Sequence, residues 1–232
     1  MKIKSLDNVK KYHSDHVENW QKIIYILDNT LVEARDNRSA PIYLTKARIK
    51  QPESAYLKFK RKRRDDPNRI TDWIGFRVLC LFQQDIEPTY QLLLRIVFEL
   101  HPLHNGERLS FKLKEVNIFN WTQDRAKQLT ELLKAELEKG HLSSTIKERD
   151  DGLDVAFNRQ GSDTIPFLLR RINKGSGYQS VHFVVEIKRD GKPAAQCEIQ
   201  LRTLLQDVWA ELEHALSYKK GKIHPHIQNS FE

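Results

Sequence analysis

Cations and one hydroxyl gather on one side of a predicted helix that begins near residue 52. The side chains concerned are Arg48, Lys50, Ser54, Lys58 and Arg61. At 100° per residue the three within the helix fall in an arc of about 60°. Ammonium and guanidinium groups pair with phosphate oxygens, and arginine can do so through two parallel hydrogen bonds, so the group could neutralise a polyphosphate. A solvated cationic helix face is the alternative.

Two acidic residues from distant segments are candidates for metal binding. Asp72 lies at the start of a predicted buried strand, and Glu198 lies on the polar face of another. Mg²⁺ prefers oxygen ligands and is commonly held by one or two carboxylates together with substrate phosphates. The two acids could hold this cation if folding brings them together. The alternative is a strand-end aspartate and a surface glutamate paired with an arginine.

A β-hairpin is the clearest pattern in the last third of the chain, where two alternating runs flank Asp190 and Gly191. A two-residue loop would set Phe183 opposite Glu198 and mix an apolar face with a polar one. A three-residue loop, with Gly191 in the left-handed position, sets His182 opposite Glu198. We therefore predict the three-residue loop and a hairpin with one polar face. That face carries Tyr178, Ser180, His182, Glu198, Gln200 and Arg202.

Helical periodicity and stop signals predict the other elements. Helices are predicted over residues 6–36, 52–64, 89–100, 122–139 and 204–217, a buried strand over 70–82, and a loop over 143–163. The chain is predicted to be a single domain, residues 1–232, with an internal insertion at about 103–165.

The last predicted helix starts at a capping box formed by Thr203 and Gln206. Its apolar stripe is predicted to be buried and consists of Leu205, Val208, Trp209, Leu212 and Leu216. The polar residues Asp207, Glu211 and His214 fall together on another face.

Charge and composition narrow the class of protein. Lys and Arg number 39 against 31 Asp and Glu, a net charge of +8, and +7 of it falls within residues 41–70. This concentration favours one polyphosphate or one stretch of nucleic acid over a basic surface spread across the molecule. The longest apolar stretches are far shorter than the roughly twenty residues that span a bilayer. Cys80 and Cys197 lie inside apolar runs. We predict a cytoplasmic protein without a membrane span, signal peptide or disulfide scaffold.

Four sequence blocks, taken in order, resemble the synthetase domain of the RelA/SpoT homologue family, in particular its small single-domain alarmone synthetases. The blocks are residues 48–58 (RIKQPESAYLK), 69–77 (RITDWIGFR), 177–182 (GYQSVH) and 198–203 (EIQLRT), the last continuing to 209–214 (WAELEH). The resemblance covers roughly residues 40–100 and 168–220. It implies an α+β fold, a nucleotidyltransferase-like mixed β-sheet flanked by helices.

The resemblance also implies an activity, transfer of the β,γ-pyrophosphate of ATP to the 3′-hydroxyl of GDP or GTP to make ppGpp or pppGpp, with Mg²⁺. It places ATP on Arg48, Lys50, Ser54, Lys58 and Arg77, to which the cationic arc adds Arg61. It makes Asp72 a ligand of Mg²⁺, and Glu198 a second ligand or the base for the 3′-hydroxyl. Tyr178 would stack on the acceptor guanine, with Lys174 and His182 near acceptor phosphates and Gln200 and Arg202 in support. A half-buried strand tyrosine is the alternative for Tyr178.

Two departures from the family pattern leave the acceptor open. Ser176 stands where the family usually has asparagine, and the insertion makes the chain longer than a typical small synthetase. An alternative is therefore a toxic relative, with an antitoxin partner, that pyrophosphorylates the 3′ end of tRNA or an adenosine nucleotide. The arginine- and lysine-rich run at residues 61–64 favours it. A non-catalytic nucleotide- or RNA-binding module is a third hypothesis. Related small synthetases are often tetramers, so a homo-oligomer is expected.

Overall fold

The structure, a computed structural model, describes residues 3–62, 65–67, 70–98, 101–102, 108–139, 143–149, 152–158, 164–172 and 178–218. Within these ranges the strands are β1 (Leu44–Ile49), β2 (Ile74–Cys80), β3 (His101–Pro102), β4 (Arg108–Phe119), β5 (Ser143–Arg149), β6 (Gly152–Asn158), β7 (Thr164–Ile172), β8 (Ser180–Arg189) and β9 (Lys192–Thr203). The helices are α1 (Leu6–Asp36), α2 (Pro52–Lys62), α3 (Ile86–Phe98), α4 (Gln123–Lys139) and α5 (Leu204–Tyr218), with a short 3₁₀ turn, η2, at Gln83–Asp85.

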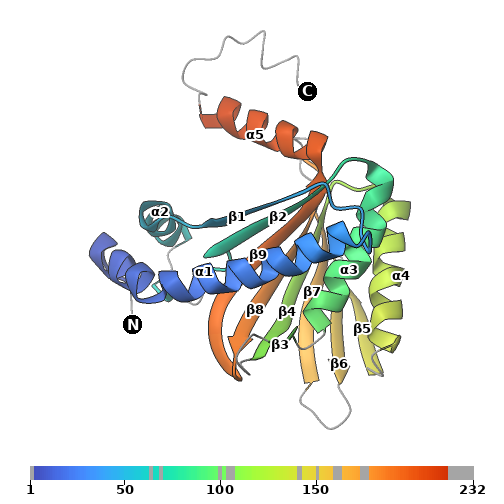
Figure 1. Cartoon of the computed structure of the whole chain (residues 1–232), viewed down its shortest axis with the longest axis horizontal. Helices are drawn as coiled ribbons and strands as arrows, with labels where there is room; N and C mark the ends of the chain where they lie inside the picture. The colour runs from blue at the N-terminus through green and yellow to red at the C-terminus, as the bar shows by residue number, and fades with distance from the viewer. Residues whose placement is uncertain are drawn as a thin grey trace.

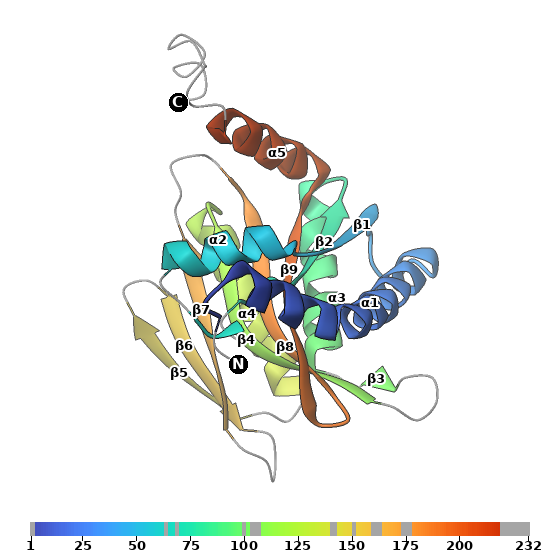
Figure 2. The same cartoon turned by 90° about the vertical axis from the view of Figure 1, so that its left-hand side faces the viewer.

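The strands form one mixed sheet in the order β1-β2-β9-β8-β4-β7-β6-β5, with β3 paired to β4. β2 and β9 run parallel, as do β4 and β7, and the other pairs are antiparallel. Figure 2 shows β1 and β5 at opposite edges of this sheet. The predicted α+β fold with a mixed sheet flanked by helices is confirmed.

One face of the sheet is apolar and is covered by α1, α3 and α4 (Figure 1). Among its fully buried side chains are Trp20 of α1, Tyr90 of α3 and Phe183 of β8. Burying a side chain such as phenylalanine contributes about 1.5–3 kcal/mol, so this layer stabilises the fold. No helix in the described part of the chain is both long and apolar enough to cross a membrane.

The predicted helices are confirmed, with small differences at their ends. α1 begins where Ser5 and Asn8 form a capping box, Ser5 Oγ accepting from the Asn8 amide and Asn8 Oδ1 from the Ser5 amide. α2 begins at Pro52 as expected, because proline suits the first helical position. β2 is shorter than the predicted strand, and Ile74, Phe76 and Val78 are buried in it as expected of a buried strand.

The loop predicted over residues 143–163 is wrong in its described parts, because β5 and β6 form a hairpin there. β6 pairs onward with β7, and β5 lies at the edge of the sheet. The sequence SSTIKER of β5 lacks the apolar alternation that indicates an inner strand. It can still form a strand because an edge strand tolerates charged and polar residues. The segment predicted to be an insertion therefore contains the sheet strands β4, β5 and β6 and the helix α4.

The β8–β9 hairpin turns through two residues, so the predicted three-residue loop is wrong. Arg189 pairs with Lys192, and Asp190 and Gly191 both have positive φ, 48° and 75°. A bulge then shifts the register by one residue, and in the body of the hairpin His182 lies opposite Gln200. The bulge changes the register by one residue, which the predicted three-residue loop would also do, so the predicted polar face is present although its residue pairs differ.

We expect Gly191→Ala to lower the free energy of unfolding by about 1 kcal/mol. A Cβ at φ 75° strains the backbone, although nothing lies within 4 Å of it. Urea unfolding would measure the loss. Asp190→Asn is the control, because asparagine tolerates the left-handed region, and it should change stability by less than about 0.5 kcal/mol. A Gly191→Ala protein as stable as the wild type would contradict the turn.

Candidate active site

The sheet face opposite α1, α3 and α4 carries polar side chains in register. One row runs through Lys46 (β1), Arg77 (β2), Gln200 (β9), His182 (β8) and Asn117 (β4), each the Cα partner of the next. Side chains of directly paired residues project from the same face of a sheet. The row therefore joins a basic end on β1 and β2 to amide and imidazole groups on β9, β8 and β4.

Asp72 lies between two lysines just before β2. Lys50 Nζ donates to its Oδ2 and Lys58 Nζ to its Oδ1, both at 2.7 Å. Burial alone would raise the pKa of this carboxyl, but hydrogen bonds and charge from the two lysines outweigh burial and hold the pKa below its ordinary value. Asp72 is thus a largely buried anion, 16% exposed, at neutral pH.

A small cavity of about 240 Å³ opens beside Asp72. It is lined by Lys50, Ser54, Leu57, Lys58, Arg61 and Asp72. The structure thus brings together the three helical side chains of the predicted arc, and adds the carboxylate. With three cations against one anion, the cavity is suited to an anionic ligand.

Trp73 fixes the position of Asp72. Its indole is fully buried, stacks on Trp20 with ring centroids 5.1 Å apart, and donates Nε1 to the Pro67 carbonyl at 2.9 Å. The Lys50 amide donates to the Trp73 carbonyl at 2.8 Å, which ties the end of β1 to the start of β2. The lysine and the aspartate are therefore held next to each other by backbone and core contacts.

Arg48 crosses β2 at Gly75. The two residues are Cα partners, and a Cβ built on Gly75 would lie 3.4 Å from Cγ and Nε of Arg48. Glu198 is the partner of Gly75 on the other side. The absence of a side chain at Gly75 leaves room for the exposed arginine on the polar face.

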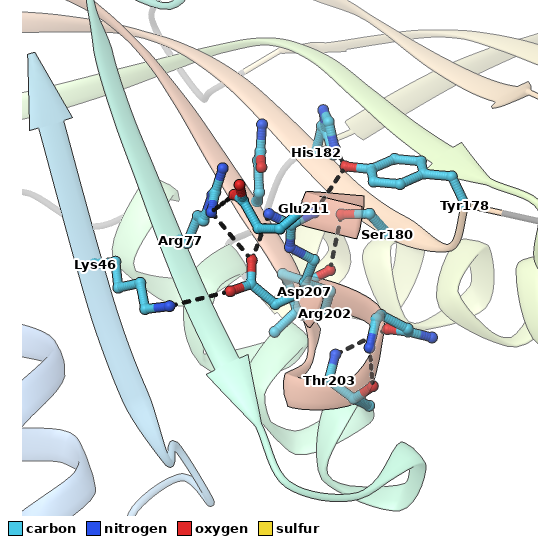
Figure 3. Close-up of polar contacts among 12 residues, drawn as sticks. Lys46, Arg77, Tyr178, Ser180, His182, Arg202, Thr203, Asp207 and Glu211 are labelled. Carbon is cyan, nitrogen blue, oxygen red and sulfur yellow. Dashed lines mark hydrogen bonds and ion pairs between the residues drawn. The ribbon is translucent and has the colours of Figure 1, made fainter. Parts of the chain in front are cut away.

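Asp207 of α5 is the centre of an ion-pair cluster on the same face (Figure 3). Its oxygens lie 2.6 Å from Arg202 Nη2, 3.2 Å from Arg77 Nη1 and 3.1 Å from Lys46 Nζ. Glu211, one turn further along α5, accepts from the same Arg77 Nη1 at 2.5 Å. This hydrogen bond holds the pKa of Glu211 below its ordinary value. Three cations against two acids leave the cluster with a positive excess.

The predicted burial of the apolar stripe of α5 is wrong for three of its residues, whereas Trp209 is half-buried and the side chain of Leu216 lies outside the described part of the chain. Leu205 is 77% exposed, and Val208 and Leu212 are about half exposed, whereas Asp207 is buried. The capping box of Thr203 and Gln206 is present as expected. α5 lies with its acidic face on β2 and β9, because the cations of the sheet attract Asp207 and Glu211.

Tyr178, His182 and Glu198 form a second polar chain beside the cluster. The Tyr178 hydroxyl lies 2.8 Å from His182 Nε2, and His182 Nδ1 lies 3.5 Å from Glu198 Oε1. Gln200 Nε2 donates to the same glutamate oxygen at 2.6 Å. The Tyr178 ring is 9% exposed and packs edge to face on Phe119. Its stacking on a base stays a prediction, and the ring would have to turn outward.

The carboxylates fit Mg²⁺ only together with a substrate. Glu198 of β9 is paired with Gly75 of β2, and Asp72 lies three residues before Gly75, in the turn that precedes β2. Within the described ranges no cluster of three or more His, Cys, Asp or Glu side chains could hold a metal ion. Mg²⁺ is often held by one or two carboxylates and substrate phosphates, and a cationic cavity beside Asp72 suits those phosphates.

A comparison with protein families finds one match, in the second half of the chain. A family model described as "Region found in RelA / SpoT proteins" matches residues 124–223. The chain contains a RelA/SpoT region. The match spans α4 to α5 and so includes the Tyr178 chain together with Arg202, Asp207 and Glu211. Lys46, Arg77, Asp72 and the two lysines bound to Asp72 precede it.

Solved structures extend the likeness to most of the fold. The small alarmone synthetase 1 from Bacillus subtilis, bound to its product pppGpp, matches with a TM-score of 0.52 and 20% identity, over 89% of this chain and 79% of that one. A GTP pyrophosphokinase family protein from Streptococcus pneumoniae matches with a TM-score of 0.54 and 20% identity, over 93% and 81%. At these identities the likeness shows a shared fold. No curated protein sequence matches the chain significantly.

Some of the residues that the sequence predicts for the active site do not line the cavity beside Asp72. Arg77 and Arg202 belong to the Asp207 cluster, not to the cavity of Asp72. Lys174 and Ser176 lie outside the described residues. Lys46 has no predicted role. Asp207 and Glu211 are predicted to share one face of the last helix, and that acidic face was the signal available in the sequence.

Proposed function

We propose that this protein transfers the β,γ-pyrophosphate of ATP to the 3′-hydroxyl of GDP or GTP, giving ppGpp or pppGpp. The observation that carries the proposal is the carboxylate of Asp72, clamped at 2.7 Å by Lys50 and by Lys58 in a cation-lined cavity. The fold shared with a synthetase that binds pppGpp supports the same reaction.

The cavity beside Asp72 is the proposed site for the transferred phosphates. Lys50, Lys58 and Arg61 would neutralise them, and the Ser54 hydroxyl would donate a hydrogen bond. Pyrophosphate transfer needs reactants in line and the developing charge stabilised, which fixed cations provide. When bound, Mg²⁺ would supply further charge neutralisation, with Asp72 and Glu198 as its protein ligands.

The transfer balances as a single displacement. The acceptor 3′-oxygen bonds to the β-phosphorus of ATP, the bond from that phosphorus to the α,β-bridging oxygen breaks, and AMP leaves with the electron pair. The 3′-hydroxyl proton must be taken up, and Glu198 is the proposed base. Its oxygen is fixed by Gln200 and lies near His182, so the carboxylate is oriented on the open face.

The acceptor nucleotide is proposed to lie on the side of β8. Tyr178 would stack on the base, and His182 would approach the acceptor phosphates with Lys174. Gln200 and Arg202 support this side through Glu198 and Tyr178, since Arg202 Nη1 lies 3.4 Å from the Tyr178 hydroxyl. Arg48 and Arg77 lie between the two sides, on adjacent rows of the sheet.

One transfer assay tests the proposal. ATP labelled in its β- or γ-phosphate is incubated with Mg²⁺ and, in parallel, GDP, GTP, ADP, AMP and tRNA. We expect label on GDP or GTP, and AMP in equal amount. Label on tRNA or an adenosine nucleotide alone would replace this acceptor with that of the toxic relatives. No label on any acceptor would refute the proposed function.

A further inference from the structure

Two acids of α5 bind the same nitrogen of Arg77 but differ in their surroundings. Asp207 lies 3.2 Å and Glu211 lies 2.5 Å from Nη1. They are four residues apart, so they lie on the same face of the helix. Figure 3 shows both carboxylates directed toward Arg77. The side chain of Asp207 is 3% exposed, and that of Glu211 is 58% exposed.

Asp207 is a fixed anchor for α5. Besides Arg77 it pairs with Lys46 and with the buried Arg202. An acid with three cationic partners and almost no contact with water is not readily displaced by a ligand, because its departure would leave a buried guanidinium uncompensated. The start of α5 therefore stays on the sheet.

Glu211, in contrast, can be displaced from Arg77 by an anionic ligand. Its ion pair with Arg77 is solvent-exposed on the glutamate side, and exposed pairs of this kind are weak. A polyphosphate offers Arg77 more negative charge and a two-point hydrogen bond, which a guanidinium prefers. The apolar side of α5 opposes little motion, because Leu205, Val208 and Leu212 are exposed.

We propose that Glu211 is a built-in competitor that occupies Arg77 in the protein without nucleotide and is displaced when a nucleotide polyphosphate binds. Asp207 keeps the first turn of α5 in place, and the later turns move away from the sheet. This inference rests on the proposed function, to which it adds Arg77 as a further residue that contacts the nucleotide polyphosphate. Glu211 then affects the affinity for nucleotide and is not a catalytic residue.

Binding measurements on two matched variants test the displacement. Glu211→Gln removes the competing charge, and Glu213→Gln removes the same charge from the same helix two residues on. By calorimetry, Glu211→Gln should bind ATP and inorganic triphosphate roughly 1.5- to 5-fold more tightly than the wild type, the range that exposed ion pairs set. Glu213→Gln should bind as the wild type does.

Hydrogen exchange gives a readout that does not depend on catalysis. Inorganic triphosphate should speed amide exchange in α5 beyond Asp207 in the wild type. Without ligand, Glu211→Gln should already exchange faster there, and triphosphate should add little.

Four results separate this inference from the proposed function. Equal affinities for Glu211→Gln and Glu213→Gln, or weaker binding by Glu211→Gln, would overturn the competitor role even if pyrophosphate transfer is observed. Unchanged α5 exchange on triphosphate binding would also overturn it. Tighter binding with faster exchange, but without transfer, would support Glu211 as a competitor and refute the proposed function. Failure to bind ATP and triphosphate at all would refute both.

Discussion

Asp72→Asn should reduce the rate of pyrophosphate transfer by at least about 100-fold, the usual effect of losing one preorganised electrostatic group. The ammonium groups of Lys50 and Lys58 each donate to one carboxylate oxygen of Asp72. Asparagine has nearly the same shape but no charge, so it cannot neutralise these two lysines. The lysines would then repel each other and lose their fixed positions. The proposed carboxylate ligand for Mg²⁺ would be lost as well. Initial rates of labelled product at saturating ATP and acceptor would measure the effect.

Asp28→Asn is the matched control for this substitution. Asp28 accepts a hydrogen bond from Thr45 Oγ1 at 2.5 Å, and Thr45 lies next to Lys46 on β1, facing the other side of the sheet. This variant makes the same chemical change in a part-buried ion away from the cavity, so its rate should stay within about threefold of the wild type. An Asp72→Asn enzyme that is equally active would remove Asp72 from the proposed chemistry.

The stability of Asp72→Asn should depend on pH in a defined direction. The folded state holds the pKa of Asp72 below its ordinary value, so this carboxyl stabilises the wild type above the unfolded pKa of about 3.9. That contribution is lost as the pH falls through the folded pKa. The stability difference between wild type and variant should therefore be largest near neutral pH and disappear in acid, which urea unfolding at several pH values would show.

Face alternation was predictable from the sequence, whereas pairing was not. The period-two pattern of β8 and β9 correctly separates the apolar face from the polar one, because alternation is a local property of each strand. The partner of His182 depends on a bulge near Ala194 that leaves no mark in the alternation. The predicted register differs from the observed one by two residues, and a shift by an even number of residues keeps each side chain on the same face. The polar face was therefore predicted correctly, although the residue pairs were not.

The orientation of α5 could not be predicted from its own sequence. The helix has both an apolar stripe and an acidic face, and an apolar stripe is normally the buried one. The cations that reverse this preference, Lys46, Arg77 and Arg202, come from three strands that are far apart in sequence. Only the sheet topology brings them together, so the cluster around Asp207 was visible only in the structure.

The cation-lined cavity was predictable in part. Ser54, Lys58 and Arg61 belong to one helix, where spacing fixes the face. Asp72 joins them because β1 pairs with β2 and the Lys50 amide bonds to the Trp73 carbonyl, a contact across more than twenty residues. Long-range pairing of this kind has no local sequence signal. The resemblance to a known family supplied the expectation that Asp72 lies near these cations.

Asp207→Asn should cause the largest loss of stability of the substitutions considered, about 3–5 kcal/mol. The reason is Arg202, whose side chain is 2% exposed and lies 2.6 Å from Asp207. Without the carboxylate this guanidinium remains buried with no compensating charge, and Arg77 and Lys46 lose the same partner. The melting temperature should fall by roughly 10 °C, measured by calorimetry in the absence of ligands.

Glu211→Gln and a second substitution at Arg202 separate the causes of that loss. Glu211 is exposed, so Glu211→Gln should cost less than about 1 kcal/mol, although it removes the same charge from the same helix face. Adding Arg202→Met to Asp207→Asn should recover part of the lost stability, because the uncompensated buried cation is then replaced by an apolar side chain. If the double variant is instead less stable than Asp207→Asn, the loss comes from detachment of α5 and not from the buried charge of Arg202.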